Sequence, residues 1–352
     1  MSRVDSGPVA EPGVRARLFE ERLDAVRTLL GGRAGVLLAR RKDFAWLTVG
    51  GQNHVLTATE EGAAPVLVTP TRAVVLAPVN EADRIADEEV AGLPLEVERL
   101  PWWEPEAASD TAQRICGGEV ATAEELGDGL DELRTMLAPL EHQRLAWLGR
   151  MAHEALVEAV GGAAEGQSEE EVGAQLAHRF ALDGVRLPVL LAAADERIER
   201  YRHPLPTARR LRRRLMVVVV VERWGVHAAQ TMFRELAPLD ETLERRAAAL
   251  RHILTAMREA TSVGATLGDV LAAAREAYAG QGIGDEWELH HQGGTIGYAS
   301  RERIAKPGDE TVIRPGMAFA WNPSARGYKL EETFYLDADG RRHTVAPLSA
   351  DG

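Results

Sequence analysis

An internal repeat in the second half of the chain restricts its fold more than any other feature. Residues 166–184 and 264–282 are segments of equal length, about 98 positions apart, that both begin and end in glycine. Ser168 and Thr266 stand where a helix N-cap is needed and are followed by acidic residues in the first helical turn. The repeat indicates a duplicated helix–helix–sheet unit. It therefore predicts a pseudo-two-fold domain with a curved sheet, outer helices and a cleft between its halves.

Apolar periodicity places further elements around this repeat. Five successive valines within 215–221 favour a strand that is buried on both faces, because β-branched residues prefer strands. In this half, helices are predicted at 141–160, 169–184, 243–257 and 267–282, and strands at 189–192, 215–221, 317–321 and 329–336.

The first half carries a different pattern. Apolar residues spaced four, three and four apart predict a helix over residues 16–30. Strands predicted at 35–39, 65–69, 73–77, 96–99 and 119–122 alternate with helical patterns at 81–90 and 110–116. This alternation predicts an α/β layer with a partly parallel sheet. Ala138-Pro139 breaks the chain before a long helix, so we predict an α/β domain at 1–138 and the pseudo-two-fold domain at 139–352, an α+β fold overall.

The overall composition excludes several classes of protein. A chain of 352 residues is long enough to bury two cores. Its net charge of −13 argues against a nucleic-acid-binding surface, and no apolar stretch approaches the length needed to cross a bilayer. The polar Met1–Arg15 stretch lacks a signal core, and the single cysteine, Cys116, fits a reducing compartment. These features predict a cytoplasmic protein without nucleic-acid or membrane partners.

One basic run stands out against this acidic background. Arg209–Arg214 contains five arginines immediately before the valine-rich strand. The simpler interpretation is a solvated turn that leads into the strand. The alternative is an anion-binding rim at the mouth of a cleft.

Four clusters of polar residues fall on or near the predicted sheet, and the first is Arg202-His203-Pro204. The proline restricts His203 to an extended or turn conformation, so the imidazole projects from a rigid loop. Histidine titrates near neutrality, which suits proton transfer. The alternative role for this histidine is a hydrogen bond to a backbone carbonyl.

The second cluster is the segment 289–298, Leu-His-His-Gln-Gly-Gly-Thr-Ile-Gly-Tyr. Alternate residues of an extended strand share a face, so only one of His290 and His291 is expected to point into a pocket. Arg301, just beyond this segment, has the planar donor geometry that binds a carboxylate. Its alternative role is an ion pair with Glu302 or another nearby acid.

The third cluster is centred on Asn322, at the end of an apolar strand, and the fourth on Glu331 and Glu332, on the next strand. These adjacent carboxylates point to opposite faces, so only one is expected in the cleft, where a buried carboxylate needs a partner. Trp321 and Tyr298 either wall the pocket or belong to the core.

Several motifs carry a resemblance to a known family. Phe44–Gly51 is similar to the N-domain pattern of the creatinase, proline-dipeptidase and methionine-aminopeptidase superfamily, and Pro315-Gly316-Met317 resembles its strand entry. The Gly-x-Ser and Gly-x-Thr helix starts resemble the repeat signature of the family. The resemblance covers nearly the whole chain. It implies a creatinase-like α/β N-terminal domain followed by a domain of the pita-bread fold, with a curved, mostly antiparallel sheet and outer helices.

The metal ligands of that family are mostly missing. Its peptidases bind two metal ions through two aspartates, one histidine and two glutamates. Gly294 stands where the family motif Gly-His-Gly-Ile-Gly has its histidine, and Asn322 replaces the first glutamate. Glu331 matches the second glutamate, whereas the strand segments expected to supply the aspartates offer only Glu222. The resemblance therefore implies a metal-free member with no cofactor.

Creatinase itself is similar to this fold without a metal, and it uses a histidine to move protons while it hydrolyses a C–N bond. His203 stands where that histidine is expected, and Arg301 stands where creatinase binds the carboxylate of its substrate. Glu331 matches a glutamate that in creatinase faces the cationic guanidinium of the substrate. The resemblance implies a metal-independent hydrolase or lyase that acts on a C–N bond of a small carboxylate-bearing substrate. His203 would be the general base and acid, and Glu331 the second catalytic residue. Substrate contacts are expected from Arg301, His291, Asn322, Arg202, Tyr298 and Glu332.

Two other functions stay open. The chain could be a non-catalytic pita-bread protein that kept the cleft for binding, or a metal-dependent Xaa-Pro aminopeptidase or dipeptidase. The expected partner is a small-molecule substrate. The resemblance to creatinase-like proteins also implies a homodimer.

Overall fold

The structure, a computed structural model, describes residues 7–347, which divide by their contacts into two compact units. The first unit is Val9–Thr135 with Trp224–Val226, and the second contains the other described residues. Residues 1–6, which belong to the polar N-terminal stretch, and residues 348–352 lie outside the described residues. No helix within the described part of the chain is long and apolar enough to cross a membrane.

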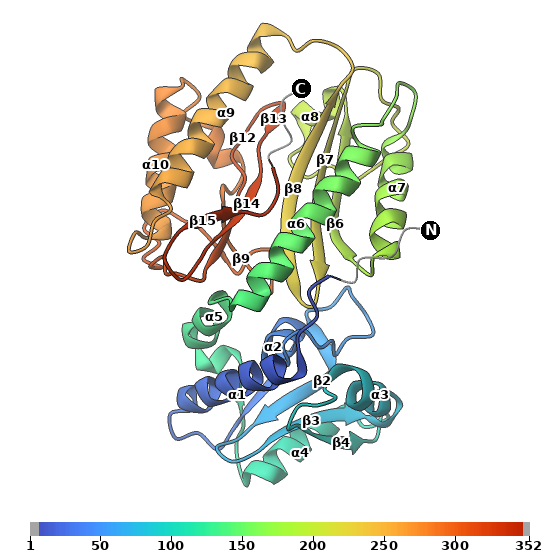
Figure 1. The fold of residues 1–352 in the computed structure, drawn as a ribbon, viewed down its shortest axis with the longest axis vertical. Helices are drawn as coiled ribbons and strands as arrows, with labels where there is room; N and C mark the ends of the chain where they lie inside the picture. Colours follow the sequence, from blue (N-terminus) through green and yellow to red (C-terminus); the bar gives the residue numbers. More distant parts are fainter. Residues whose placement is uncertain (1–6, 348–352) are drawn as a thin grey trace. The chain divides into compact units, whose positions relative to one another are not determined.

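The first unit is built on one five-stranded sheet (Figure 1). Its strands are β1 (Val36–Arg40), β2 (Glu61–Val68), β3 (Ala73–Pro78), β4 (Glu96–Leu100) and β5 (Ala121–Thr122). Its helices are α1 (Pro12–Leu29), α2 (Arg41–Leu47), α3 (Val79–Arg84) with a π-helical turn (Ile85–Glu89), α4 (Ala107–Cys116), a 3-10 turn (Glu124–Leu126) and α5 (Asp128–Thr135). In the order β4-β3-β2-β1-β5, the outer pairs are parallel and β2 is antiparallel to both neighbours, so the sheet is partly parallel as predicted.

The second unit contains two larger antiparallel sheets and a small hairpin. The first sheet consists of β6 (Arg186–Ala194), β7 (Arg214–Arg223) and β8 (Val226–Glu235). The second, in the order β10-β9-β11-β14-β15, consists of β9 (Gly293–Ile296), β10 (Arg303–Ile304), β11 (Ala318–Trp321), β14 (Glu332–Leu336) and β15 (Arg342–Thr344). The hairpin pairs β12 (Ser324–Ala325) with β13 (Tyr328–Lys329). The helices are α6 (Pro139–Ala159), α7 (Glu169–Leu182), α8 (Glu196–Arg200), α9 (Glu241–Ala260), α10 (Leu267–Gly280) and the 3-10 helix η3 (Glu286–Leu289).

Both copies of the sequence repeat make the same backbone contacts. In the first copy, the N–H of Gly166 donates to the carbonyl of Leu211 at 2.8 Å. In the second copy, the N–H of Gly264 donates to the carbonyl of Ile313 at 2.9 Å. The same residues also donate in return: the N–H of Leu211 donates to the carbonyl of Gln167, and the N–H of Ile313 donates to the carbonyl of Ala265. The two halves of this unit are therefore built alike, as the repeat predicted.

The helix caps of the repeat give a first test of this arrangement. The Ser168 hydroxyl accepts the N–H of Glu171 at 3.1 Å, and the Thr266 hydroxyl accepts the N–H of Asp269 at 3.0 Å. We expect Ser168→Ala to lower the free energy of unfolding by about 0.5–2 kcal/mol, because one N–H at the start of α7 loses its acceptor. Urea unfolding followed by circular dichroism measures the loss. Thr28→Ala, on the exposed side of α1, is the control and should leave the midpoint unchanged.

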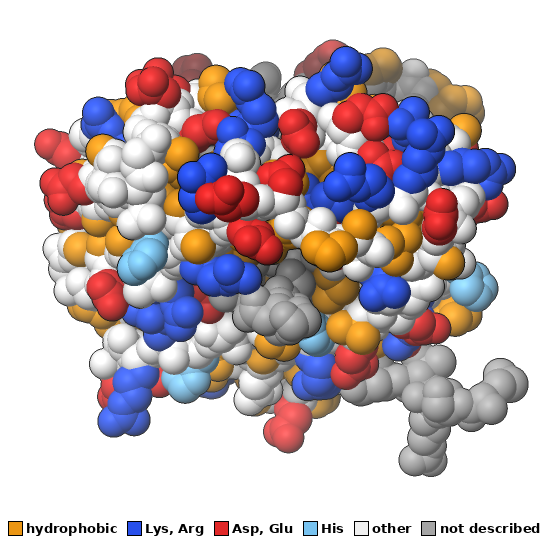
Figure 2. Space-filling view, turned by 90° about the horizontal axis from the view of Figure 1, so that it is seen from above, with side chains coloured by type: hydrophobic (Ala, Val, Ile, Leu, Met, Phe, Trp, Pro, Cys, Tyr) orange, Lys and Arg blue, Asp and Glu red, His pale blue; other side chains and the backbone are white. Residues whose placement is uncertain are grey.

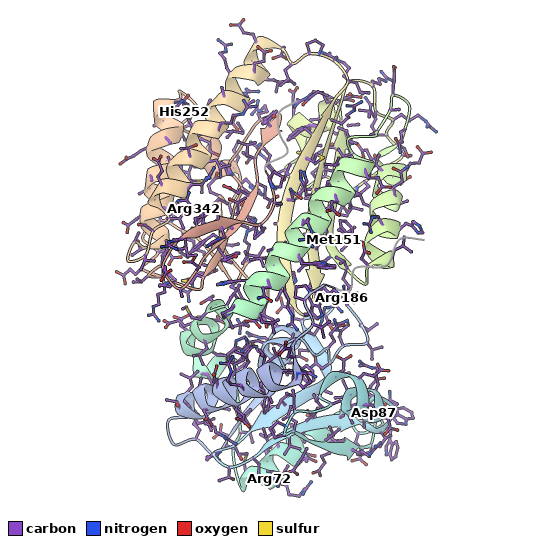
Figure 3. The ribbon with its side chains drawn as sticks, viewed as in Figure 1. Arg72, Asp87, Met151, Arg186, His252 and Arg342 are labelled. Carbon is purple, nitrogen blue, oxygen red and sulfur yellow. The ribbon has the colours of Figure 1, made fainter. Side chains whose placement is uncertain are left out.

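Helices cover the two halves of this unit from outside, and the sheets meet between them. In Figure 1, α6 and α7 lie beside β6 to β8, while α9 and α10 lie beside the second sheet. Met151 of α6, labelled in Figure 3, is one of the buried residues of that cover. The Thr333 hydroxyl joins β14 to β8, since it donates to the carbonyl of Ala229 at 2.8 Å and accepts its N–H at 3.2 Å. This contact holds β14 of the second sheet beside β8 of the first.

The basic run Arg209–Arg214 is held by acidic partners. The guanidinium of Arg214 donates to Glu235 at 2.7 Å, and the carboxylate of Asp195 accepts the backbone N–H of Arg213 at 2.8 Å. These contacts favour a turn that leads into β7 over an anion-binding rim. On the face shown in Figure 2, positive and negative side chains are interspersed and not separated by sign.

Candidate functional site

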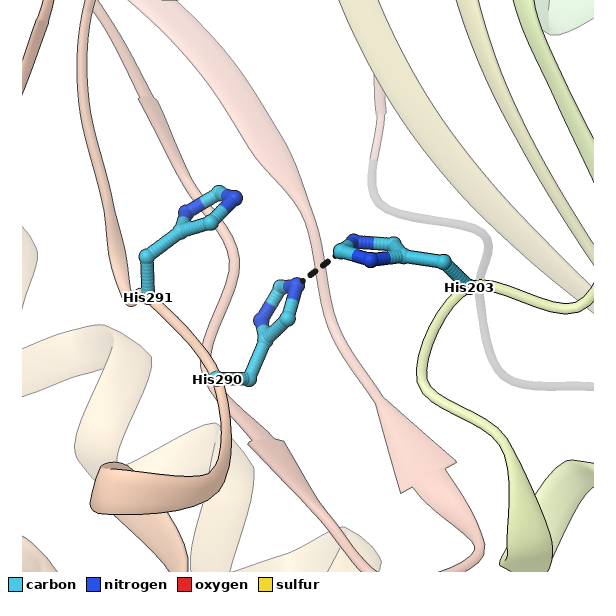
Figure 4. Close-up of side chains that lie close together, drawn as sticks. All are labelled: His203, His290 and His291. Atoms are coloured by element: carbon cyan, nitrogen blue, oxygen red, sulfur yellow. Dashed lines mark hydrogen bonds between the residues drawn. The ribbon is translucent and has the colours of Figure 1, made fainter.

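Three imidazoles gather at one point of the second unit. His203 comes from the loop between α8 and β7, while His290 and His291 follow η3 and precede β9 (Figure 4). The Nε2 atoms of His203 and His290 are 3.0 Å apart. The ring centroids are 4.9 Å apart for His203 and His290, and 6.4 Å apart for His203 and His291. Residues separated by more than 80 positions in the sequence therefore form one cluster.

Both histidines of the second sequence cluster belong to this group, so the expectation that their side chains lie on opposite faces was wrong, although only His290 lines the neighbouring pocket. That prediction assumed an extended strand through His290 and His291, but β9 begins only at Gly293. The two rings stack on the same side with centroids 4.3 Å apart. The Gln292 side chain holds this segment against η3, since it donates to the carbonyl of Trp287 at 3.0 Å and also to that of His290.

Asn322 sets the hydrogen-bonding direction within the cluster. Its Oδ1 accepts from Arg301 at 3.4 Å, and its Nδ2 donates to the carbonyl of His291 at 3.4 Å. The same Nδ2 lies 3.3 Å from Nδ1 of His290, so this nitrogen is the acceptor. A neutral imidazole carries one proton, so the proton of His290 is on Nε2 and points at Nε2 of His203. Asn322 thus determines which nitrogen of His203 accepts a hydrogen bond.

A second group, of charged residues, surrounds Glu331. Arg301 donates to its Oε1 at 2.9 Å, the Lys329 ammonium lies 3.4 Å from its Oε2, and the Thr231 hydroxyl donates to Oε2 at 2.8 Å. Lys329 and Glu331 are both almost fully buried, at 7% and 4% exposure. A buried carboxylate is tolerated only when it is paired and hydrogen-bonded, and Glu331 meets both conditions.

The charges in the cluster follow from burial and from the two cations. Burial, assisted by the Lys329 ammonium, lowers the pKa of His290 to about 2, while burial and Arg301 lower the pKa of His291 to about 4. Partial burial also lowers the pKa of His203, although its side chain is exposed at the surface. Burial acts to raise the pKa of Glu331, but Lys329 and Arg301 outweigh it and the pKa is lowered. Near neutral pH, three uncharged imidazoles therefore lie beside a charged carboxylate.

Two buried nitrogens of the site have no hydrogen-bond partner among the described residues. They are Nε of Arg301 and Nδ1 of His291. Unpaired buried polar atoms are rare in folded proteins and call for a ligand or water. A shallow pocket adjoins the cluster and is lined by residues that include Arg202, His290 and Lys329. These nitrogens lie in the cluster that the pocket adjoins, although neither Arg301 nor His291 lines the pocket itself.

The other residues predicted for the site lie elsewhere or have other partners. Arg202 lines the pocket, but its guanidinium donates to Glu286 and to the carbonyl of Ala325, both at 2.8 Å. The buried Tyr298 donates its hydroxyl to Glu141 at 3.0 Å. Glu332 faces the opposite side of its strand from Glu331 and pairs with Arg258 at 3.3 Å. The structure therefore brings together His203, His290, His291, Arg301, Asn322 and Glu331.

Lys329 and Thr231 were not predicted as site residues. Lys329 stands two positions before Glu331, and alternate residues of an extended segment share a face, so the spacing alone could have indicated the pair. Thr231 lies on β8, about 100 positions from Glu331, and no sequence signal marks it. Its role follows only from the meeting of the two sheets.

Comparison with known proteins assigns the chain to a family. Residues 144–341 match the family model described as metallopeptidase family M24. The chain belongs to family M24. No curated protein matches its sequence. The family contains the dipeptidase type that the motifs resemble, and it places this M24 protein among hydrolases.

Solved structures share the fold of this M24 protein over nearly its whole length. A dipeptidase from Pyrococcus horikoshii OT3 is 19% identical, with a TM-score of 0.77 over 93% of this chain and 98% of that one. A prolidase from the same organism is 16% identical, with a TM-score of 0.75 over 94% and 99%. The N-terminal domain of FACT complex subunit SPT16 from Cicer arietinum (chickpea) is 14% identical, with a TM-score of 0.69 over 94% and 96%. The predicted α+β pita-bread fold is thereby confirmed.

The residues of this M24 protein do not fit the two-metal centre that the family resemblance implies. Glu331, the carboxylate at a family ligand position, is already bound by Arg301 and Lys329. Glu222 instead binds Arg186, which is labelled at the start of β6 in Figure 3. Two cations beside the retained carboxylate repel divalent ions, whose usual ligands are carboxylates.

Proposed function

We propose that this M24 protein hydrolyses a C–N bond in a small carboxylate-bearing substrate without a bound metal ion, and that His203 moves the proton. One observation carries the proposal: Arg301 and Lys329 both bind Glu331 at a family ligand position, beside three neutral imidazoles. Two positive charges against one negative charge leave the site with a net positive charge. Such a site attracts an anionic group of the substrate.

The substrate carboxylate has a binding place in this proposal. Arg301 offers its unpartnered Nε, and His291 its unpartnered Nδ1, as buried polar atoms next to the charged group. A guanidinium binds a carboxylate through directional, charge-assisted hydrogen bonds. Asn322 keeps the guanidinium in position, and Glu331 interacts with a positive or hydrogen-bond-donating group of the substrate. The reacting bond then lies toward His203.

His203 supplies proton transfer in the reaction. Its Nε2 accepts the proton of His290 in the ligand-free protein, and a water molecule that replaces this contact meets a free lone pair. His203 takes a proton from that water molecule while the water oxygen bonds to the carbon of the C–N bond. As the C–N bond breaks, His203 returns the proton to the leaving nitrogen. His290 does not compete for this proton, because burial holds its pKa at about 2.

A metal-dependent Xaa-Pro dipeptidase is the second candidate function. The likeness to a dipeptidase and a prolidase favours it, since these proteins share the fold over nearly the whole chain. A third possibility is a binding role, because the fold also occurs in a subunit of the FACT complex. The donor set around Glu331 argues for the metal-independent enzyme over the dipeptidase.

Metal removal combined with a substrate panel tests the proposal. The purified protein is treated with a chelator, its metal content is measured, and it is assayed against guanidino, ureido and N-acyl amino acids and Xaa-Pro dipeptides. We expect turnover of a carboxylate-bearing substrate that is unchanged by metal removal. Turnover restricted to Xaa-Pro dipeptides and to protein loaded with two ions would establish the second candidate instead. Absence of turnover across the panel would contradict both enzymatic functions.

A further inference from the structure

We propose that His203, His290 and His291 form a binding site for one transition-metal ion, and that an ion bound there inhibits the enzyme. The site uses none of the positions at which the family binds its two ions. Its inhibitory effect rests on the proposed function, whereas the binding itself does not. Among residues 7–347, these three form the one group of three or more potential ligands close enough to share an ion.

The distances between the ligand atoms suit a single ion. The three ligand nitrogens lie within 4.8 Å of one another, and the two Nε2 atoms are 3.0 Å apart. Tetrahedral coordination with Zn–N bonds of about 2.0–2.1 Å separates ligand nitrogens by about 3.4 Å. Small side-chain rotations therefore bring the three imidazoles into position. In Figure 4 all three rings extend into the same space from two loops.

The ligand type selects the ion. Imidazole suits zinc, copper, nickel and cobalt, whereas magnesium and calcium prefer oxygen ligands. Imidazole binds such ions through an unprotonated ring nitrogen, and three imidazoles converge here. Three protein ligands next to an open pocket leave one coordination position for water or a small anion.

Two features weaken the binding and define its tests. The Lys329 ammonium is close enough to lower the pKa of all three imidazoles, so it also repels a divalent ion. An ion bound to Nε2 of His290 moves the ring proton to Nδ1. The Asn322 amide must then rotate so that its oxygen accepts a hydrogen bond from this Nδ1–H group. The contacts that hold this amide are long, 3.3–3.4 Å, and Arg301 keeps Glu331 as its closer partner. This rotation of the Asn322 amide is therefore feasible, although it reduces the affinity of the site for the metal ion.

Inhibition follows from the position of His203. A metal ion that coordinates its Nε2 occupies the lone pair on which the base depends, so the histidine cannot accept a proton. Zinc is therefore expected to lower turnover at the same concentrations at which it binds.

Calorimetric titration of the chelator-treated protein with zinc chloride tests the binding. We expect one ion per chain for the wild type and at least a tenfold loss of affinity in His291→Ala and in His290→Ala. Asn322→Asp supplies a carboxylate that accepts the Nδ1 proton of His290, so its affinity should rise by about 10- to 100-fold. His252→Ala removes an exposed histidine on α9, labelled in Figure 3, and should change neither binding nor activity. Thermal unfolding of each variant in the absence of zinc verifies that the variant is folded. His291→Asn is used in place of a histidine variant that fails to fold.

The outcomes separate the site from the proposed function, because the titration needs no substrate. Stoichiometric binding that is lost in the His290 and His291 variants supports the site. Binding that these variants leave unchanged, or no binding by the wild type, overturns it. Zinc that raises turnover overturns the inhibitory role together with the metal-independent function, even where the stoichiometry is one. Zinc that lowers turnover in the wild type but not in His290→Ala supports the whole proposal.

Discussion

Replacement of His203 by alanine is expected to lower kcat/KM by about 100- to 10,000-fold, which is the usual contribution of a positioned general acid–base group. The loss should appear mainly in kcat, because Arg301 and His291, which hold the substrate, are unchanged. Stopped assays with the substrate identified from the panel measure it. Added imidazole should restore part of the activity, since His203 is exposed and its removal leaves room for a small base.

The control is His178→Ala, which removes an exposed histidine from α7, outside the three-histidine cluster. It should leave kcat/KM within about twofold of the wild type, since it changes no group that contacts the substrate. The thermal midpoint of His203→Ala should stay near that of the wild type, because the loop side chain contributes little buried surface. Wild-type turnover in a folded His203→Ala protein contradicts the base role.

The fold was predictable because its signals are local and repeated. The valines of β7, the caps at Ser168 and Thr266, and the glycines at the ends of the repeat each reflect the conformation of a few neighbouring residues. Short elements were harder: α2, with the buried Phe44, was not predicted, because seven residues are too few for a clear helical period.

The site was only partly predictable because it depends on contacts between distant segments. Pro204 marks the loop of His203, but nothing in the sequence shows that His290 comes within 3.0 Å of it. The alternation rule failed at His290 and His291 because it holds only inside a strand, and β9 begins only at Gly293. Lys329 belongs to the fourth polar cluster but was given no role in the site, since lysine is rarely buried.

Replacement of Glu331 by glutamine should lower the free energy of unfolding by about 3–5 kcal/mol, the usual effect of removing one partner from a buried ion pair. Glutamine has the same shape, so the change removes charge and little packing. Arg301 and Lys329 would then lie buried without a counter-charge. Lys329 is able to relieve part of this cost by losing its proton, because burial already lowers its pKa. Urea unfolding at constant pH measures the change.

The neighbouring position supplies the matched control. Glu332→Gln makes the same substitution one residue along the chain, but its partner Arg258 is 34% exposed, so solvent screens the pair and the loss should be smaller. The double variant Glu331→Gln with Lys329→Met should be more stable than the sum of the two single changes, because it removes a buried cation together with its counter-charge. A coupling energy of about 0.5–3 kcal/mol is expected. Equal losses at Glu331 and Glu332, or strict additivity in the double variant, would show that the cations around Glu331 do not depend on its charge.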